Sequence, residues 1–287
     1  APEDYTVQDN PSLWLDGQII TDDVAGFTTD PVGTLQLGGL RYTAPESTTL
    51  NIATGNTLGI DGNILVTPTV LDNDQAIDGG SLTGPVGGGM LGIQQNSTGD
   101  FAIYSSIVDN GGAIGFVKGG TGKVTLYNVF NSYTGATIIA GGTLHVGVIG
   151  NGGAVSAIGA SSADPSNLVL QSGILRYGGT TATTDRGFTL LNGGPARTIQ
   201  IDSGTANLTF TGLVTSPDDA GLTKTGAGTL TLANAANDYV GVTTVAGGTL
   251  SVGTLADGNA PSGIGAASSS SANLVLRNDG RLQYTGV

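Results

Sequence analysis

Few residues of this chain have side chains that commonly carry out catalysis. His145 is the only histidine, and there is no cysteine, so a thiolate zinc site and a disulfide framework are both excluded. His145 lies in the segment Thr-Leu-His-Val, where a general base is conceivable, but no serine or cysteine nucleophile motif accompanies it. We therefore interpret His145 as an exposed residue of a β-strand.

The glycine-rich segment Gly119–Lys123 has only a superficial likeness to a phosphate-binding loop. In the required spacing, Val117 stands where the first glycine belongs and Val124 where a serine or threonine belongs. No helical pattern follows that would offer its N-terminus to a phosphate. We interpret this segment as a chain corner.

One acidic segment has enough oxygen ligands to suggest calcium. Asp72, Asp74 and Asp78 lie within nine residues that end in two glycines, and hard cations prefer carboxylate oxygens. The segment lacks the spacing and the terminal glutamate of an EF-hand loop. Calcium binding and an ordinary acidic loop are both retained as interpretations, and no other cofactor is expected.

A carbohydrate-active enzyme is the alternative from another functional class. Asp202 with Arg197, or Asp185 with Arg186, would supply a carboxylate and a cation in a groove. Cleavage of polysaccharides usually requires two carboxylates at a set separation, together with aromatic residues that stack on sugars. Aromatic residues make up only 5% of the chain. We therefore predict that the protein is not an enzyme.

The charge distribution excludes two classes of partner. The net charge is −13, and residues 1–117 contain 14 acidic residues and a single basic one, Arg41. A negative field of this size repels phosphate backbones and anionic lipid headgroups. We expect neither nucleic-acid binding nor direct lipid binding.

Short β-prone segments bounded by Gly, Asn and Asp recur along the chain, and no stretch has helical periodicity. No apolar run approaches the ~18 residues of a membrane helix. The predicted strands are Thr34–Leu37, Thr49–Ile52, Ile64–Val66, Phe101–Tyr104, Lys123–Leu126, Thr137–Ile139, Thr143–Val146, Asn167–Leu170, Thr198–Ile201, Asn207–Phe210, Thr229–Leu232, Thr249–Val252 and Asn273–Leu276. Such brevity, with 50 glycines, favours the faces of a coil over a broad sheet.

A long internal repeat organises these strands. Residues 115–147 and 221–253 align without a gap at an offset of 106, with 18 of 33 positions identical. An offset of this size corresponds to roughly five solenoid coils of ~20 residues. We predict a single elongated right-handed parallel β-helix that is truncated at its C-terminal end. Residues 1–100 form its atypical, acidic coils and cap, and residues 101–287 form its repeat-bearing part.

The identical positions of the repeat have structural interpretations. Glycine and asparagine tolerate the positive φ that a coil corner requires, tyrosine suits the edge of a core, and a repeated lysine is expected to be solvated or paired with a carboxylate of a neighbouring coil. Recurrent threonines are expected to form ladders across coils. The residues concerned are Lys118, Asn131, Tyr133, Gly141, Gly142, Lys224, Asn237, Tyr239, Gly247 and Gly248.

The pattern GLTKTGAGTLTLANAANDYVGVTTVAGGTLSVG of residues 221–253 resembles the autotransporter-associated β-strand repeat of bacterial type V secreted proteins. Residues 115–147 depart from that pattern at Val117, Lys123 and Ile139. The resemblance implies a passenger exported through the periplasm and then through a C-terminal outer-membrane β-barrel of the parent chain.

For function, the resemblance implies a non-enzymatic cell-surface protein that acts in adhesion, self-association or biofilm cohesion. Its partners would be other copies of itself or a ligand on a host or matrix surface. The alternative within the same class is a structural stalk or export scaffold for a separate effector domain. These are expectations from the family, since no site in the repeat indicates an activity.

Overall fold

The computed structural model describes residues 6–7, 14–22, 33–194 and 197–286. Two compact units make up the chain, Ala1–Thr137 with Val155–Ala160, and Ile138–Ala154 with Ser161–Val287. The described residues contain no α-helix, and the 3-10 turns among them are Pro68–Val70, Pro165–Asn167 and Ser271–Asn273. No helix in this described part is long and apolar enough to span a membrane. The predicted division at residue 100 stays a prediction.

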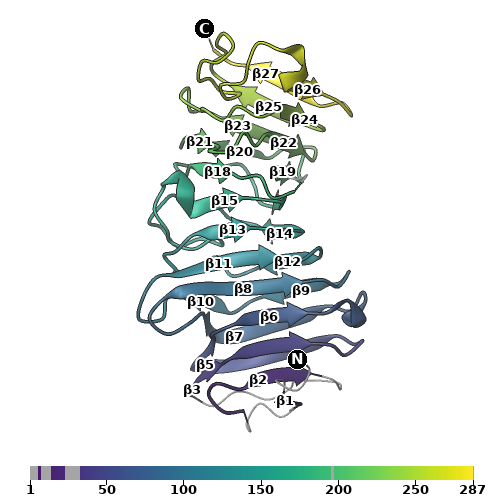
Figure 1. Cartoon of the computed structure of the whole chain (residues 1–287), viewed down its shortest axis with the longest axis vertical. Helices are drawn as coiled ribbons and strands as arrows, with labels where there is room; N and C mark the ends of the chain where they lie inside the picture. Colours follow the sequence, from purple (N-terminus) through teal and green to yellow (C-terminus); the bar gives the residue numbers. More distant parts are fainter. Residues whose placement is uncertain (1–5, 8–13, 23–32, 195–196, 287) are drawn as a thin grey trace. The chain divides into compact units, whose positions relative to one another are not determined.

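The first unit is built from parallel strands that return to the same sheet once per coil (Figure 1). One sheet has the order β1 (Thr6–Val7), β2 (Ile19–Asp22), β4 (Gly39–Tyr42), β6 (Asn63–Val66), β8 (Gly89–Gln95) and β11 (Ile114–Gly119). A second has the order β3 (Thr34–Leu37), β5 (Thr48–Ile60), β7 (Gln75–Thr83), β9 (Asp100–Ile103) and β12 (Lys123–Leu126), with β10 (Ser106–Val108) paired to β7. β13 (Thr137–Ile139) begins at the last residue of this unit's main segment.

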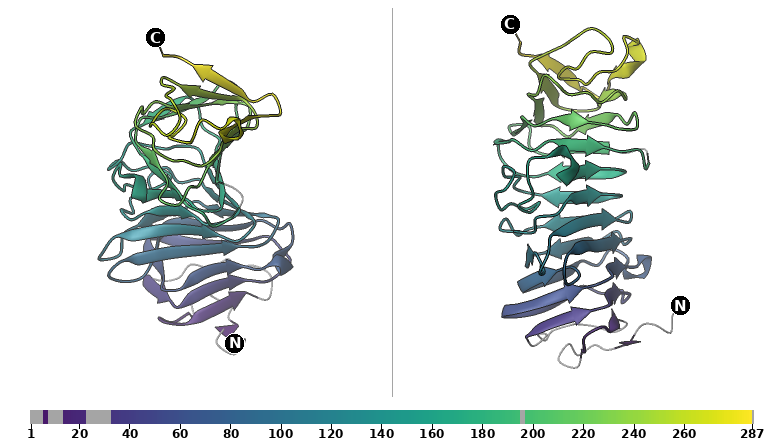
Figure 2. Two further views of the ribbon diagram at one scale, coloured as in Figure 1. Left: turned by 45° about the horizontal axis from the view of Figure 1, so that its top comes forward. Right: turned by 60° about the vertical axis from the view of Figure 1, so that its left-hand side comes forward.

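The second unit repeats this architecture with three sheets of parallel strands. The first contains β15 (Leu168–Leu170), β18 (Phe188–Leu190) and β21 (Val214–Thr215). The second contains β14 (Thr143–Val146), β16 (Gly173–Tyr177), β19 (Arg197–Ile201), β22 (Leu222–Thr225), β24 (Thr243–Val245) and β26 (Leu274–Leu276). The third contains β17 (Ala182–Thr184), β20 (Asn207–Phe210), β23 (Thr229–Leu232), β25 (Thr249–Val252) and β27 (Arg281–Tyr284). The right-hand view of Figure 2 shows the strands of successive coils as stacked arrows.

The core of each unit consists of apolar residues that stack in register. Leu208, Leu230 and Leu250 are fully buried and lie beside one another on β20, β23 and β25. Two residues further along the same strands, Phe210 and Leu232 form a second inward column. Because side chains alternate between the two faces of a strand, the threonines between these columns point outward. Burying each such leucine contributes about 1.5–3 kcal/mol of stability.

The structure confirms an all-β fold of parallel coils, and most predicted strands are present within a residue or two of the predicted bounds. The prediction of five coils per repeat is wrong. In the second unit, the register places Ile174 beside Thr143, Thr198 beside Ile174, Thr223 beside Thr198 and Thr244 beside Thr223. Four coils therefore span nearly one repeat. The coils differ in length because some of the turns that join their strands are long loops.

Glycine substitutions at coil corners test this stacking. Gly226 has φ +76°, and a Cβ there would lie 2.2 Å from the carbonyl oxygen of Ile201. We expect Gly226→Ala to lower the free energy of unfolding by about 2 kcal/mol or more, because a left-handed alanine is strained and the clash is with backbone. Urea unfolding followed by circular dichroism measures the change.

Gly253→Ala is the matched control, since a Cβ at Gly253 would have no atom within 4 Å. Its free energy of unfolding should stay within about 0.5 kcal/mol of the wild-type value. Equal destabilisation by the two variants would contradict the corner assignment of Gly226.

Candidate functional site

The repeated lysines lie at coil corners and are buried. Lys118 and Lys224 each have no exposed surface. The Nζ atom of Lys224 donates hydrogen bonds to the carbonyl oxygens of Thr225 at 2.6 Å, Gly226 at 3.1 Å and Gly247 at 3.2 Å. The Nζ atom of Lys118 donates to Gly119 at 2.6 Å and Gly120 at 3.2 Å.

The prediction that these lysines are solvated or paired with a carboxylate is therefore wrong. A glycine-rich corner turns several backbone carbonyls towards one point, and a buried carbonyl without a donor is costly. The long side chain of a lysine near the end of the strand that enters the corner supplies up to three donors. The segment Gly119–Lys123, which has a likeness to a phosphate loop, is one of these corners, with φ +73° at Gly120.

Burial lowers the pKa of Lys118 and of Lys224 to about 8. Removal of an ammonium group from water disfavours its charged form. Both lysines are still mainly protonated at pH 7, so the corner contains a buried cation held by carbonyl dipoles.

The repeated tyrosines lie inside the core, not at its edge as predicted. Tyr133 and Tyr239 are fully buried. The hydroxyl of Tyr133 is 2.7 Å from Thr137 Oγ1, and that of Tyr239 is 2.8 Å from Thr243 Oγ1. The threonine four residues later satisfies the phenol, which removes the need for solvent contact. Burial also raises the pKa of Tyr239 above its ordinary value.

The repeated asparagines act through their side chains and not through positive φ. Neither Asn131 nor Asn237 has positive φ, so that prediction is wrong for them. Asn131 Oδ1 accepts from the amide of Ile107 at 2.8 Å, and its Nδ2 donates to the carbonyls of Asn128 at 3.0 Å and Ala157 at 2.9 Å. Asn131 thereby links chain segments from three successive turns.

Asn237 preserves only part of this bridge. Its Oδ1 accepts from the amide of Val214 at 2.9 Å, but its buried Nδ2 has no hydrogen-bond partner among the described residues. For the glycines of the repeat, the expected positive φ is present at Gly142, Gly247 and Gly248, whereas Gly141 has no positive φ.

The acidic calcium candidates are arranged as separate backbone acceptors. Asp74 Oδ1 accepts from the amide of Asp100, and Asp78 Oδ1 accepts from the amide of Gly79, each at 2.7 Å. Asp72 is exposed. Among the described residues, no group of three or more His, Cys, Asp or Glu is placed to hold a metal ion. Calcium binding by Asp72, Asp74 and Asp78 stays a prediction that ligand-dependent melting would test.

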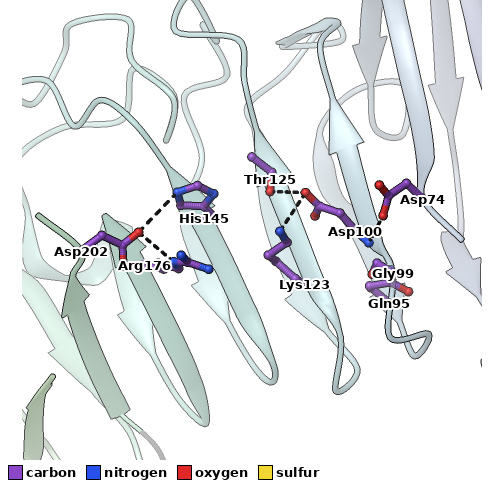
Figure 3. Close-up of polar contacts among 9 residues, drawn as sticks. All are labelled: Asp74, Gln95, Gly99, Asp100, Lys123, Thr125, His145, Arg176 and Asp202. Atoms are coloured by element: carbon purple, nitrogen blue, oxygen red, sulfur yellow. Dashed lines mark hydrogen bonds and ion pairs between the residues drawn. The ribbon is translucent and has the colours of Figure 1, made fainter. Parts of the chain in front are cut away.

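Two polar networks lie on outward strand faces, one in each unit (Figure 3). In the first unit, Asp100 Oδ2 is 3.2 Å from Lys123 Nζ and accepts from Thr125 Oγ1 at 2.7 Å. In the second, Asp202 accepts from Arg176 Nε at 2.8 and 3.1 Å and lies 4.0 Å from His145 Nε2. His145 thus joins an inter-coil charge network and is only partly exposed.

The arginines proposed for a carbohydrate enzyme donate to oxygens other than the carboxylates proposed with them. Arg197 donates to the carbonyls of Gly221 at 3.0 Å and Gly194 at 2.7 Å, while Asp202 is bound by Arg176. Arg186 is buried and donates to Gly150 O and Ser161 Oγ, both at 2.9 Å. These arginines satisfy backbone and hydroxyl oxygens, as the repeated lysines do.

One surface feature was not predicted. Tyr104 and Tyr127 stack with ring centroids 4.6 Å apart and planes at 7°, and they are 44% and 51% exposed. Each tyrosine directly follows a strand, β9 or β12, and these two strands are paired in register. In the sequence, a tyrosine follows each of two short segments with alternating polarity. This pattern predicts a stack only when the two segments are known to be neighbouring strands.

Comparisons with known proteins identify relatives of the chain. A family profile described as Passenger-associated-transport-repeat matches residues 116–146 and 222–252. Over 287 residues, 99% of the chain is 53% identical to the Adhesin BmaC autotransporter of Brucella suis biovar 1 (strain 1330). The chain spans about 8% of the length of that relative. No solved structure matches the chain.

Replacement of a corner lysine tests its structural role. We expect Lys224→Met to lower the free energy of unfolding by about 2 kcal/mol, because three carbonyl oxygens lose their donor. The same substitution at the exposed Arg277 removes an equal charge. Arg277→Met should change the free energy of unfolding by less than about 0.5 kcal/mol. Chemical unfolding followed by far-ultraviolet circular dichroism measures both variants. An equal loss of free energy of unfolding in the two would contradict the corner role.

The depressed pKa values predict a pH dependence. A folded-state pKa of about 8 against an ordinary value of 10.5 means that the unfolded chain binds more protons between these values. Stability should therefore rise with pH, by roughly 1–2 kcal/mol per lysine between pH 8 and 10. Unfolding midpoints measured across this range should show the rise in the wild type and its loss in Lys118→Met/Lys224→Met. A parallel rise in both proteins would show that other groups cause it.

Proposed function

The chain belongs to the autotransporter passengers that carry the passenger-associated transport repeat, and we propose that it is a section of a bacterial surface adhesin. The observation that carries the proposal is the 53% identity to part of a protein named as an autotransporter adhesin, over essentially the whole chain. In this proposal the parent chain is exported to the cell surface through its own outer-membrane barrel. The segment then contributes binding surface along its coils.

The outward face of the third sheet of the second unit suits repeated contacts. Thr183, Thr209 and Thr231 lie beside one another on β17, β20 and β23, and each is at least partly exposed, whereas the next residue of the column, Ser251, is buried. Hydroxyls in a regular column offer donors and acceptors at the ~4.8 Å spacing of the coils. A second copy of the same face, or an extended ligand, can match that spacing. This column supports adhesion or self-association by lateral hydrogen bonding.

A structural stalk is the second candidate, and two observations favour it. The matched segment is only 8% of the relative, so the adhesive contacts of the parent can lie elsewhere. In addition, the lysines, asparagines and tyrosines of the repeat are buried, which accounts for them without a ligand. A carbohydrate enzyme has less support, because Asp202 is held in an ion pair with Arg176.

Surface display of the full parent protein distinguishes adhesin from stalk. We expect Thr183→Lys/Thr209→Lys, which introduces two charges into the hydroxyl column, to reduce cell clumping and attachment to matrix-coated surfaces severalfold. Ser269→Lys, in an exposed loop, is the control and should leave both unchanged. Surface amounts and protease resistance are measured in parallel to confirm equal display and folding.

Undiminished clumping and attachment by the column variant would contradict a role for this face. If removal of the whole segment, residues 1–287, leaves both clumping and attachment unchanged, the stalk is favoured. If that removal abolishes attachment but the column variant does not, the contacts lie elsewhere in the segment.

A further inference from the structure

A groove of ≈ 380 Å³ lies over the outward face of β5, β7, β9 and β12 in the first unit. Its floor is formed by small residues, Ala76 and Ala102, which adjoin in register on β7 and β9. Two residues along the strands in one direction lie the carboxylates of Asp74 and Asp100. The same distance in the other direction lies the tyrosine stack.

The two sides of the groove are chemically different. The stacked Tyr104 and Tyr127 present ring surface and hydroxyl groups, and about half of each residue is exposed. Burial is the largest cause that raises the pKa of Tyr104. Charge repulsion from Tyr127, Asp100 and Asp78 raises it further. Asp100 and Tyr104 lie at opposite ends of β9, ~13 Å apart along the strand, so an extended segment can contact both of them.

The charge close to the groove is negative. Asp74 is exposed and has no ion-pair partner among the described residues. Lys123 compensates Asp100 at 3.2 Å, which leaves the exposed Asp74 and Asp78 as an excess of negative charge. Such a field raises the local concentration of cations and speeds their association.

We propose that this groove binds a lysine- or arginine-bearing segment of a partner protein, which rests on the adhesive function proposed above. An ammonium or guanidinium group near the tyrosines is attracted by the ring electrons. A second basic group of the same segment, about four strand residues away, can pair with Asp74. The alanine floor leaves room for the aliphatic stem, as long basic side chains lay their methylene groups on apolar surface.

A neutral sugar fits the groove less well. Sugars and cations both contact the flat faces of aromatic rings, so the tyrosine stack by itself does not separate the two kinds of ligand. A cation gains from the carboxylates at any orientation, whereas a neutral ligand gains only from directed hydrogen bonds. The observations therefore favour a basic ligand over a saccharide.

Isothermal titration of the whole chain with decalysine tests the proposal, with decaglutamate and cellohexaose as parallel probes. We expect decalysine to bind and the other two to be inert. Tyr127→Ala should weaken decalysine binding about two- to fivefold, as expected for loss of one exposed cation–π contact. Asp74→Asn should weaken it by a similar factor and reduce its dependence on salt.

Two matched variants control for aromatic loss and for charge. Phe130→Ala removes an aromatic residue that is 70% exposed and outside the groove, and Asp238→Asn removes an exposed charge in the second unit. Both should bind decalysine as the wild type does. Equal weakening by Tyr127→Ala and Phe130→Ala, or binding of cellohexaose in place of decalysine, would overturn the proposal. Circular dichroism and melting temperatures confirm that each variant is folded.

The surface-display assay separates this proposal from the adhesive function. If Tyr127→Ala and Asp74→Asn lose decalysine binding and also lower attachment of displaying cells, both proposals are supported. Normal attachment by these variants would overturn the groove as the adhesive site and leave adhesion itself standing. Normal decalysine binding by both variants would overturn the groove directly.

Discussion

Parallel backbone pairing between successive coils is the constraint on which the remaining structure depends. Each strand hydrogen-bonds to strands of the preceding and following coils, so a residue on one coil lies beside its counterpart on the next. Apolar residues must therefore recur at the same register, as Leu208, Leu230 and Leu250 do. Because each strand is paired on both sides, strands of only three or four residues are enough to form a stable sheet.

Corners are where this pairing is most demanding. The chain must turn sharply between faces, and glycines with positive φ such as Gly226 and Gly248 make the turn. The turn directs carbonyl oxygens inward, where they need donors. Lys224 supplies them from within the core. The repeat thus keeps a lysine and a glycine-rich corner together because each would be unstable without the other.

The same constraint acts less on the outward positions, and the proposed interaction surfaces lie there. Outward residues on adjoining strands form columns, so a single residue type repeated on successive coils becomes a continuous surface. The threonine column of the second unit and the Tyr104–Tyr127 stack of the first unit both arise in this way. Binding would then depend on the composition of a column, and no coil alone would contain a complete site.

The sequence by itself determined many of the short strands, the internal repeat and the resemblance to a transport-repeat family, because each depends on local pattern. Strands such as Thr229–Leu232 and Thr143–Val146 have their predicted bounds, since alternation and flanking glycines are local signals. Only the tertiary structure decided which coils adjoin, because unequal turn lengths change the register without changing the strand pattern. The burial of Lys118 and Lys224, the bridges of Asn131, the pairing of Asp202 with Arg176 and the tyrosine stack all depend on that register.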